Sequence, residues 1–265
     1  MESNKKYAVI TGASSGIGYA TAKAFAKRGK NLIIVARRKE QLEHLKKEVL
    51  EINPALDVVI KVCDLSILQN AYHLYDELTE YYIETWINNA GFGDYRSVSR
   101  MDLNKVGTML RLNVETLTVL SSLYVRDYKE VEGTQLINIS SGGGYVIVPN
   151  AVTYCATKFY VSAFTEGLAH ELTAEQAKLQ AKVLAPAATQ TEFGKTANNV
   201  SEYDYDKNFG NYHTSVQMAD LLLELYDSDQ TVGAINRDSF TFSLRSPIFD
   251  YAGNSINNQK HIMIK

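Results

Sequence analysis

Short apolar runs alternate along the chain with longer stretches in which apolar residues recur every three or four positions. A run of four to eight aliphatic residues is typical of a buried strand, and the longer period is typical of a helix with one apolar face. This pattern predicts strands at residues 7–11, 31–36, 58–63, 84–88, 134–140 and 181–185, with 240–244 as a candidate last strand. It predicts helices at residues 21–29, 41–52, 67–82, 103–128, 153–173 and 215–226.

The order of these elements indicates the fold class. Apolar strands that alternate with helices indicate a parallel sheet covered by helices on both faces, which is the α/β class. The pattern contains no internal repeat, low-complexity tract or linker, so we expect one domain over residues 1–265. Within it, residues 192–214 form a polar and aromatic stretch without a clear period. We expect a substrate loop there, either a mobile lid or a solvated connector whose aromatic residues pack locally.

Composition and charge narrow the class of protein. The chain has 265 residues, of which 45% are hydrophobic and 22% charged, and its formal charge is −3. These values are ordinary for a globular domain and exclude a disordered, collagenous or coiled-coil chain. The near balance of charge does not favour a nucleic acid or an anionic membrane as partner. The longest apolar runs are far below the ~20 residues of a membrane helix, and residues 1–6 are too polar for a signal peptide.

The cysteines and histidines give no sign of disulfides or metals. Cys63 and Cys155 lie 92 positions apart, which fits neither a disulfide framework nor a zinc spacing. The five histidines are scattered, and His170-Glu171 lacks the second histidine of a zinc-protease motif because Ala174 stands there. We therefore expect no metal site and a reducing, cytoplasmic location.

A glycine-rich turn follows the first predicted strand. It reads Thr11-Gly12-Ala13-Ser14-Ser15-Gly16-Ile17-Gly18 and leads into a helical stretch. Glycines allow a tight turn and a close approach of the backbone to a pyrophosphate. The start of the helix offers the anion free N–H groups and a positive dipole end. The turn therefore predicts a dinucleotide site, and its candidate binding residues are Gly12, Ser14, Ser15, Gly16, Ile17 and Gly18.

Two other interpretations of the same turn are weaker. Gly12 to Gly16 also match the G-x-S-x-G elbow of hydrolases. That fold needs earlier strands to carry its oxyanion loop, and only eleven residues precede Gly12. A tight turn that binds no ligand is the plain alternative.

The end of the second predicted strand indicates which dinucleotide binds. Cofactors with a free ribose 2′-hydroxyl usually meet an acid about 20 residues after the glycines, whereas this chain has Arg37-Arg38 there. A guanidinium can hold a 2′-phosphate through two charge-assisted hydrogen bonds. We therefore expect NADP(H) in preference to NAD(H), with Arg37 as the first contact and Arg38 as the second, unless both are simply solvated. After the third strand, Asp64 with its neighbour Leu65 fits either an adenine pocket or the N-cap of the next helix.

A serine, a tyrosine and a lysine form the candidate catalytic group. Ser141 ends the fifth predicted strand, Tyr154 comes 13 residues later, and Lys158 lies four residues further on the same helix face. A free phenol has a pKa of about 10, and a neighbouring ammonium and an oxidised nicotinamide both favour its ionised form. Tyr154 would then pass protons at neutral pH while Ser141 holds the substrate oxygen for hydride transfer.

The tyrosine–lysine spacing is not specific by itself. It occurs three times, at Tyr19/Lys23, Tyr154/Lys158 and Tyr203/Lys207. Only Tyr154 has a serine at a strand end 13 residues before it, so we assign the chemistry to this pair. The alternative for Tyr154 is an aromatic residue that merely packs in a helix interface.

Together these motifs resemble those of the short-chain dehydrogenase/reductase family over about residues 5–192. The residues that carry the resemblance are Thr11 to Gly18, Asn88-Asn89-Ala90-Gly91, Asn113, Ser141, Tyr154 and Lys158. The resemblance implies a Rossmann-type, doubly wound parallel sheet of about seven strands that holds the cofactor and the active site in one domain. It implies that Tyr154 is the acid/base, that Lys158 lowers its pKa and binds the nicotinamide ribose, and that Ser141 binds the substrate oxygen.

The resemblance also implies roles that the residues alone do not reveal. Asn113 would hold a proton-relay water near Lys158, although an asparagine within a helix more often faces solvent or marks a local kink. Asn88 to Gly91 would stabilise the sheet behind the cofactor, although Asn88 by itself is more typical of a turn. The residues that would line the cofactor after the fourth strand are Asn89, Ala90 and Gly91.

One segment departs from the family pattern. Members carry Pro-Gly and then a threonine after the sixth strand, whereas this chain reads Pro186-Ala187-Ala188-Thr189-Gln190-Thr191. Pro186, Thr189 and Thr191 remain candidates for contact with the nicotinamide. Ala187 does not easily adopt left-handed backbone angles, which leaves the path of this loop open.

The combined expectation is an NADP(H)-dependent oxidoreductase that reduces a carbonyl, or oxidises a secondary alcohol, of a small uncharged substrate. Candidate substrate walls lie at residues 92–95, 143–148 and 192–213. A non-catalytic nicotinamide-binding regulator would predict a damaged triad, and a sugar-nucleotide epimerase would need more than the ~75 residues that follow the sixth strand. The resemblance implies a homodimer or homotetramer built on the helices at 103–128 and 153–173.

Overall fold

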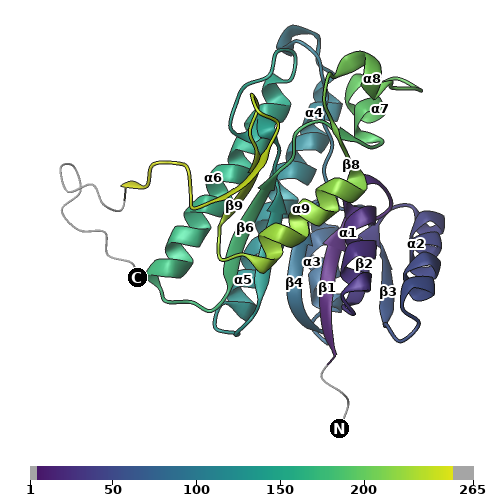
Figure 1. The fold of residues 1–265 in the computed structure, drawn as a ribbon, viewed down its shortest axis with the longest axis vertical. Helices are drawn as coiled ribbons and strands as arrows, with labels where there is room; N and C mark the ends of the chain where they lie inside the picture. The colour runs from purple at the N-terminus through teal and green to yellow at the C-terminus, as the bar shows by residue number, and fades with distance from the viewer. Residues whose placement is uncertain (1–4, 253–265) are drawn as a thin grey trace.

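An eight-stranded sheet forms the centre of the computed structural model, which describes residues 5–252 (Figure 1). Its strands lie in the order β10-β9-β6-β5-β4-β1-β2-β3. All of the pairings are parallel except that of β10 with β9. The strands are β1 Lys6–Thr11, β2 Asn31–Ala36, β3 Val58–Val62, β4 Tyr82–Asn88, β5 Gln135–Ile139, β6 Gln180–Ala185, β9 Val232–Ile235 and β10 Phe242–Arg245.

The α/β class and the mainly parallel sheet are as predicted, but the sheet has one strand more than the sequence pattern gives. The strand missed by the pattern is β9, a four-residue element whose sequence Val-Gly-Ala-Ile carries only two large apolar side chains. The last strand, β10, begins at Phe242 rather than at residue 240. It pairs antiparallel with β9 and so supplies an edge that parallel alternation does not predict.

Helices cover both faces of this sheet (Figure 1). They are α1 Gly16–Lys27, α2 Lys39–Ile52, α3 Leu68–Glu77, α4 Leu103–Leu110, α5 Leu117–Tyr128, α6 Val152–Ala174, α7 Phe193–Asn198, α8 Tyr205–Asn208 and α9 Ser215–Asp227. The apolar residues of α1, α2 and α9 pack on one face, and those of α3, α5 and α6 pack on the other. The short strands β7 Thr189–Gln190 and β8 His213–Thr214 pair with each other outside the main sheet.

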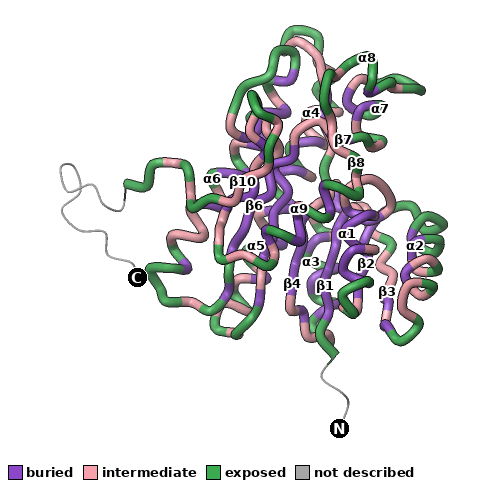
Figure 2. Tube along the Cα trace, in the orientation of Figure 1, coloured by how far each residue is buried: buried purple, intermediate pink, exposed green. Residues whose placement is uncertain are grey.

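The side chains of β1 show how the strands serve both layers. Ala8 and Ile10 face the layer of α1, α2 and α9, whereas Tyr7 and Val9 face the layer of α3, α5 and α6. Successive side chains of a strand point to opposite faces, so a strand between two helical layers must be apolar at every position. Figure 2 shows the result, a sheet that is buried along most of its length.

The predicted helix at 103–128 is continuous but not regular. Between α4 and α5, residues Arg111–Thr116 form a π-helical segment that holds Asn113. Two helix boundaries differ from the prediction by five residues: α1 begins at Gly16 rather than at residue 21, and α3 ends at Glu77 rather than at residue 82. The second difference arises because Tyr82 is already the first residue of the buried strand β4.

The order of the strands places a crevice at one edge of the sheet. From β1 the chain builds outward through β2 and β3, then crosses to β4 on the other side of β1. Loops that leave β1 and β4 at their carboxyl ends therefore diverge, and ligands of open α/β sheets bind in the crevice between such loops.

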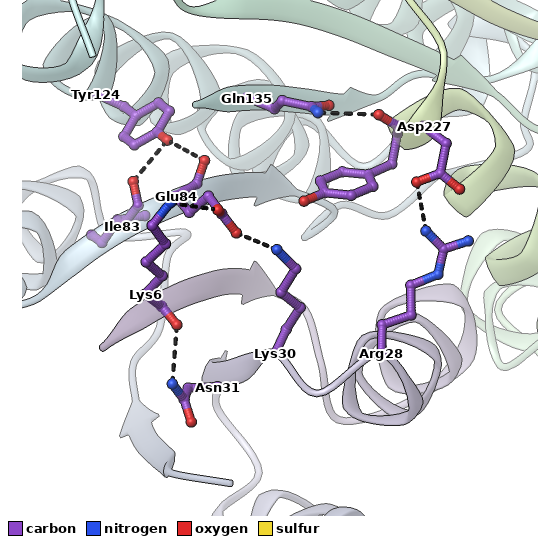
Figure 3. Close-up of polar contacts among 10 residues, drawn as sticks. Lys6, Arg28, Lys30, Asn31, Ile83, Glu84, Tyr124, Gln135 and Asp227 are labelled. Carbon is purple, nitrogen blue, oxygen red and sulfur yellow. Dashed lines mark hydrogen bonds and ion pairs between the residues drawn. The ribbon is translucent and has the colours of Figure 1, made fainter. Parts of the chain in front are cut away.

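The opposite, amino edge of the sheet is closed by a network of charged and polar groups (Figure 3). Glu84 in β4 accepts hydrogen bonds from Lys6 at 3.2 Å and from Lys30 at 2.5 Å. The hydroxyl of Tyr124 donates to the carbonyl oxygens of Ile83 and Glu84 at 3.0 Å each. These contacts join β1, β4, α5 and the turn before β2. Burial raises the pKa of Glu84, but the hydrogen bonds from the two lysines outweigh it, and the net effect lowers this pKa.

We expect Glu84→Gln to lower the free energy of unfolding by about 1 kcal/mol at pH 7, because two partly exposed lysines lose their anion. The carboxylate stabilises the fold above its ordinary pKa of 4.5, and this stabilisation is lost as pH falls through the lower folded-state pKa. The difference from wild type should therefore vanish in acid. Urea unfolding at several pH values measures it, with Glu80→Gln at an exposed neighbouring acid as control. Equal losses in the two variants would contradict the role of the network.

Candidate active site

The loops after β1 and β4 are locked together at the crevice. The hydroxyl oxygen of Thr11 accepts from the backbone N–H groups of Asn89 and Ala90 at 3.0 Å each. The amide of Asn89 donates to the carbonyl oxygens of Thr11 at 2.9 Å and of Gly12 at 3.2 Å. A Cβ on Gly18 would lie 2.5 Å from the amide nitrogen of Asn89. The glycine is thus required by the packing of the two loops as well as by any ligand.

The glycine turn leaves the start of α1 open to an anion. Gly12 and Gly16 have φ values of +66° and +60°, which side chains other than glycine adopt with strain. Ser15 occupies the N-cap of α1 but makes no capping hydrogen bond with its side chain, and the first turn carries no acid. The N–H groups at this end are therefore available to a pyrophosphate, as the sequence predicts. The residues fit the phosphate part of a dinucleotide.

Arg38, rather than Arg37, lies on the glycine turn. Its guanidinium donates to the hydroxyl of Ser14 at 3.0 Å and to that of Ser15 at 2.8 Å. Arg37 points outward with 70% of its side chain exposed and lies 3.9 Å from the carboxylate of Asp64. Arg38 thus lies over the glycine turn and Arg37 lies beside Asp64, and the order in which the two arginines contact a 2′-phosphate stays a prediction.

Asp64 does not cap the next helix, and its place in an adenine pocket stays a prediction. Its carboxylate accepts from the backbone N–H of Ser66 at 3.0 Å and from the Ser66 hydroxyl at 2.7 Å. The N-cap of α3 is Ile67, so the capping alternative is wrong. Leu65 is buried, and its carbonyl oxygen accepts from Thr116 at 2.7 Å. Asp64 closes a turn beside Arg37 at the rim of the crevice.

The candidate catalytic residues meet at the carboxyl end of β5. Tyr154 and Lys158 lie one turn apart near the start of α6, and both are buried. The ammonium of Lys158 donates to the carbonyl oxygen of Ile139 at 2.8 Å and lies 5.9 Å from the centre of the Tyr154 ring. Ser141 follows β5, and its hydroxyl accepts from the N–H of Gly143 at 3.1 Å. The predicted triad is therefore brought together in space.

Burial shifts the pKa values of Tyr154 and Lys158 in directions that the sequence analysis did not predict. It raises the pKa of the Tyr154 phenol, and hydrogen bonding with Ser141 only partly opposes this effect. Burial also lowers the pKa of Lys158 to about 8. The physical reason is the same for both groups, because removal from water disfavours the phenolate and the ammonium alike. In the protein alone, Tyr154 is therefore an acid at neutral pH.

Asn113 sits in the π-helical segment and uses its whole side chain to hold its neighbours. Its amide oxygen accepts from the N–H of Phe92 at 3.2 Å, and its nitrogen donates to the Phe92 carbonyl at 2.9 Å and to Thr157 at 3.1 Å. The sequence left two alternatives for an asparagine within a helix, a local kink or a solvent-facing side chain. The π-helical segment is such a local irregularity, and Asn113 does not face solvent because it is buried. A Cβ on Gly91 would lie 3.0 Å from the Asn113 oxygen and 3.6 Å from the Lys158 nitrogen. The absence of a side chain at Gly91 therefore allows both groups to approach the backbone of this loop.

Asn88, predicted to stabilise the sheet, is the centre of a buried polar network. Its oxygen accepts from the indole of Trp86 at 2.8 Å, and its nitrogen donates to Ser121 at 3.0 Å and to Asn138 at 2.9 Å. Asn138 in turn donates to Thr165 on α6 at 2.9 Å. Buried polar groups that satisfy one another in this way fix the relative positions of their elements. Here they fix α6 against β4 and β5.

The segment after β6 runs beside the glycine turn without unusual backbone angles. The carbonyl oxygen of Pro186 accepts from the N–H of Gly142 at 2.7 Å. Ala187 is not among the described residues with positive φ, so replacing the family's glycine imposes no strain. The Thr189 hydroxyl bonds to the Ala187 carbonyl, and Thr191 lies on the turn, 3.0 Å from the position of a Cβ on Gly16.

The stretch 192–214 is ordered by contacts at both ends. The pairing of β7 with β8 brings the residues just before this stretch next to its last two residues, His213 and Thr214. The N–H of Tyr95 donates to the carbonyl of Ala197 at 2.8 Å. Lys105 bridges Thr196 to the buried carboxylate of Asp94, with distances of 3.2 and 2.6 Å.

The aromatic residues of this stretch fall into two groups. Tyr205 packs locally against its neighbours, with ring centres 5.0, 5.8 and 5.4 Å from those of Tyr203, Phe209 and Tyr212. Phe193 instead lies on Tyr154, with 5.3 Å between the two ring centres. The contacts of Tyr205 are those of a connector whose aromatic residues pack locally, and the contact of Phe193 is the one expected of a lid. Both alternatives for this stretch therefore stay predictions.

Glu166 is a functional candidate that the sequence argument missed. It is 1% exposed, and its carboxylate accepts from the hydroxyl of Tyr145 at 2.6 Å and from the N–H groups of Ile248 and Phe249 at 2.5 and 2.9 Å. Tyr145 belongs to the turn that follows Ser141. A signal was present, because polar residues recur every four positions along α6 at Tyr154, Lys158, Ser162 and Glu166.

We expect Glu166→Ala to destabilise the protein by about 1–3 kcal/mol, because it leaves three donors at partly buried contacts without their acceptor. Urea unfolding gives this number, and hydrogen exchange at Ile248 and Phe249 should accelerate at the same time. Glu171→Ala, at an exposed acid of the same helix, is the matched control. Unchanged exchange at both amides would show that Glu166 does not hold this segment.

Among residues 5–252, no helix is long and apolar enough to cross a membrane. Within the same part of the chain, no group of three or more histidine, cysteine or acidic side chains is arranged to hold a metal ion.

The fold and the site define an oxidoreductase that acts on alcohol or carbonyl groups. Residues 6–201 match the model of the short chain dehydrogenase family. This chain belongs to the short-chain dehydrogenase/reductase family. A human relative, dehydrogenase/reductase SDR family member 11, is 30% identical over 194 residues, which are 71% of this chain and 75% of the relative. The 7beta-hydroxysteroid dehydrogenase of Clostridium sardiniense is 34% identical over 169 residues, 63% of each chain.

Solved structures agree with this assignment. A short-chain dehydrogenase from Sphingobium yanoikuyae in complex with NADPH is similar with a TM-score of 0.80 and 26% identity, covering 88% of this chain and 89% of that one. A bulky-bulky ketone specific alcohol dehydrogenase from Comamonas testosteroni gives a TM-score of 0.74 and 26% identity, with 88% and 86% covered.

Proposed function

We propose that this protein is an NADP(H)-dependent carbonyl reductase that acts on a small uncharged ketone or aldehyde and, in reverse, on the secondary alcohol. The observation that carries the proposal is the grouping of Ser141 with the buried Tyr154 and Lys158, together with the open N-terminus of α1. A regulator that only binds nicotinamide is the alternative, and it gives no reason for these three side chains to be grouped.

The preference for NADP(H) rests on the surroundings of Arg38. Its guanidinium lies on Ser14 and Ser15, and no acid stands at the end of β2 to accept from a ribose 2′-hydroxyl. Arginine and hydroxyl donors on one spot are suited to a phosphate. The similar structure from Sphingobium yanoikuyae, a complex with NADPH, supports the same choice.

The chemistry of reduction follows from the positions of the three side chains. A bound dihydronicotinamide supplies the hydride for the carbonyl carbon. Ser141 holds the carbonyl oxygen, and the phenol of Tyr154 gives its proton to that oxygen as negative charge develops there. The raised pKa of Tyr154 keeps this proton in place at neutral pH. Lys158, anchored on the Ile139 carbonyl, stabilises the phenolate that remains.

The substrate class follows from the walls around Tyr154. Met109 and Ala151 are buried beside it, and Phe92, Tyr95 and Phe193 pack against the same cluster. Walls of this kind favour an uncharged, apolar substrate. The Comamonas testosteroni enzyme is named for bulky ketones and the Clostridium sardiniense enzyme for a hydroxysteroid, so these two proteins support a ketone or an alcohol as substrate but not its small size.

The proposal extends to assembly and location. Exposed apolar side chains lie on α4 and α6, namely Leu103, Leu110, Val152 and Tyr160. They support the homodimer or homotetramer expected from the family resemblance. A cytoplasmic location is proposed on the two free cysteines, Cys63 and Cys155.

We expect Tyr154→Phe to lower kcat/KM for NADPH-dependent reduction by at least about 1,000-fold across a panel of ketones and aldehydes, because the variant lacks the proton donor. The loss of absorbance at 340 nm measures turnover, and calorimetric titration checks that NADPH still binds. Tyr160→Phe, on the same helix, is the control. Absence of turnover by the wild type with every carbonyl of the panel would favour the regulator. Undiminished turnover by Tyr154→Phe would contradict the role of Tyr154, and equal kcat/KM with NADPH and NADH would remove the cofactor preference.

The lowered pKa of Lys158 gives a pH dependence with a definite sign. The ammonium is present below a pKa of about 8 and is lost above it. We therefore expect kcat/KM for carbonyl reduction to fall as pH rises through about 8, while Tyr154 remains protonated. Rates measured from pH 6 to 10 test this, and the residual rate of Lys158→Met should lack the fall. A wild-type profile that is flat to pH 10 would contradict the assignment.

A further inference from the structure

Three consecutive residues after β7 touch three different parts of the site. Thr191 lies on Gly16 of the glycine turn, as described above. Glu192 binds the guanidinium of Arg38, and the ring of Phe193 lies on Tyr154. The chain therefore crosses the crevice from its phosphate end to its catalytic end within three residues, and Glu192 is the charged one of the three.

Glu192 meets Arg38 in a two-point contact. The distances are 3.2 Å from Nη1 to Oε1 and 2.9 Å from Nη2 to Oε2. Hydrogen bonding from Arg38 is the main reason that the pKa of Glu192 is lowered, and Ser15 contributes in the same direction. The carboxylate thus takes the donors of Arg38 and Ser15 that, under the proposed function, would serve a phosphate.

The two side chains are 46% and 56% exposed. An ion pair at this exposure contributes little to the stability of the fold. The pair does, however, neutralise a guanidinium whose other neighbours are the hydroxyls of Ser14 and Ser15. A carboxylate carries one negative charge, whereas a phosphate monoester carries between 1.5 and 2 at pH 7. A 2′-phosphate therefore competes well for these donors, and a 2′-hydroxyl does not.

We propose that Glu192 is a specificity-determining residue that competes with the ribose 2′-phosphate for Arg38. This inference rests on the proposed NADP(H) function. It adds a residue whose carboxylate weakens the binding of NADP(H). NADPH must displace the carboxylate, so part of the attraction of Arg38 is cancelled. NADH leaves the Arg38–Glu192 pair in place. Glu192 thereby narrows the difference in affinity between the two cofactors.

The test compares the affinities of NADP(H) and NAD(H) for Glu192→Gln and wild type by calorimetric titration at fixed ionic strength. We expect the Kd for NADPH to fall roughly two- to fivefold, the size expected for the loss of an exposed ion pair. The Kd for NADH should stay within a factor of two. Glu202→Gln, at an exposed acid of the same loop, corrects for the change in net charge.

Arg38→Gln separates this inference from the proposed function. Alone, it should weaken NADPH binding by at least tenfold and leave NADH binding unchanged, and failure of that result would overturn the cofactor proposal. In the Arg38→Gln background, Glu192→Gln should have no further effect on either Kd. If Arg38→Gln behaves as expected but Glu192→Gln does not tighten NADPH binding, or tightens NADH binding equally, only the competitor role is overturned. Thermal midpoints within a few degrees of wild type show that each variant is folded.

Discussion

The close approach of the loops after β1 and β4 is the constraint on which the rest of the site depends. Thr11 and Asn89 tie these loops together, and Gly18 admits the amide of Asn89 where any side chain would clash. This contact directs the N-terminus of α1 toward the crevice. It also places Gly91 beside Lys158 and Asn113, so the phosphate end and the catalytic end of the site share one support.

Burial serves and opposes the proposed chemistry at the same time. A buried pair excludes water from the reacting atoms and strengthens their electrostatic interaction. The same burial takes the pKa of Lys158 down to about 8 and favours the protonated phenol. The carbonyl oxygen of Ile139 offsets part of this effect, since it accepts a hydrogen bond from the lysine. The resulting site is better prepared to donate a proton than to remove one, which agrees with reduction as the favoured direction.

Local patterns in the sequence were sufficient for the parts of the fold that repeat a simple rule. The strands β1 and β2 contain continuous apolar runs, and the spacing of Ser141, Tyr154 and Lys158 places all three at one site. The pattern did not reveal β9, whose small residues carry little apolar signal. It also could not indicate how Arg38 lies, because this side chain pairs with Glu192, which lies 154 positions away. Contacts of that range leave no periodic trace.

The π-helical segment between α4 and α5 has a consequence for insertions and deletions. A π turn inserts an extra residue into a helix, and each residue turns an α-helix by about 100°. The carboxyl half of the long helix, α5, packs on the sheet. Its amino half, α4, carries Lys105, which donates hydrogen bonds to Asp94 and to the carbonyl of Thr196. Deleting one residue from Arg111–Thr116 would swing Lys105 by about a quarter turn away from the loop it supports while α5 stayed in place. The number of residues in this segment, more than their identity, therefore determines how α4 and Lys105 are oriented relative to α5 and the sheet.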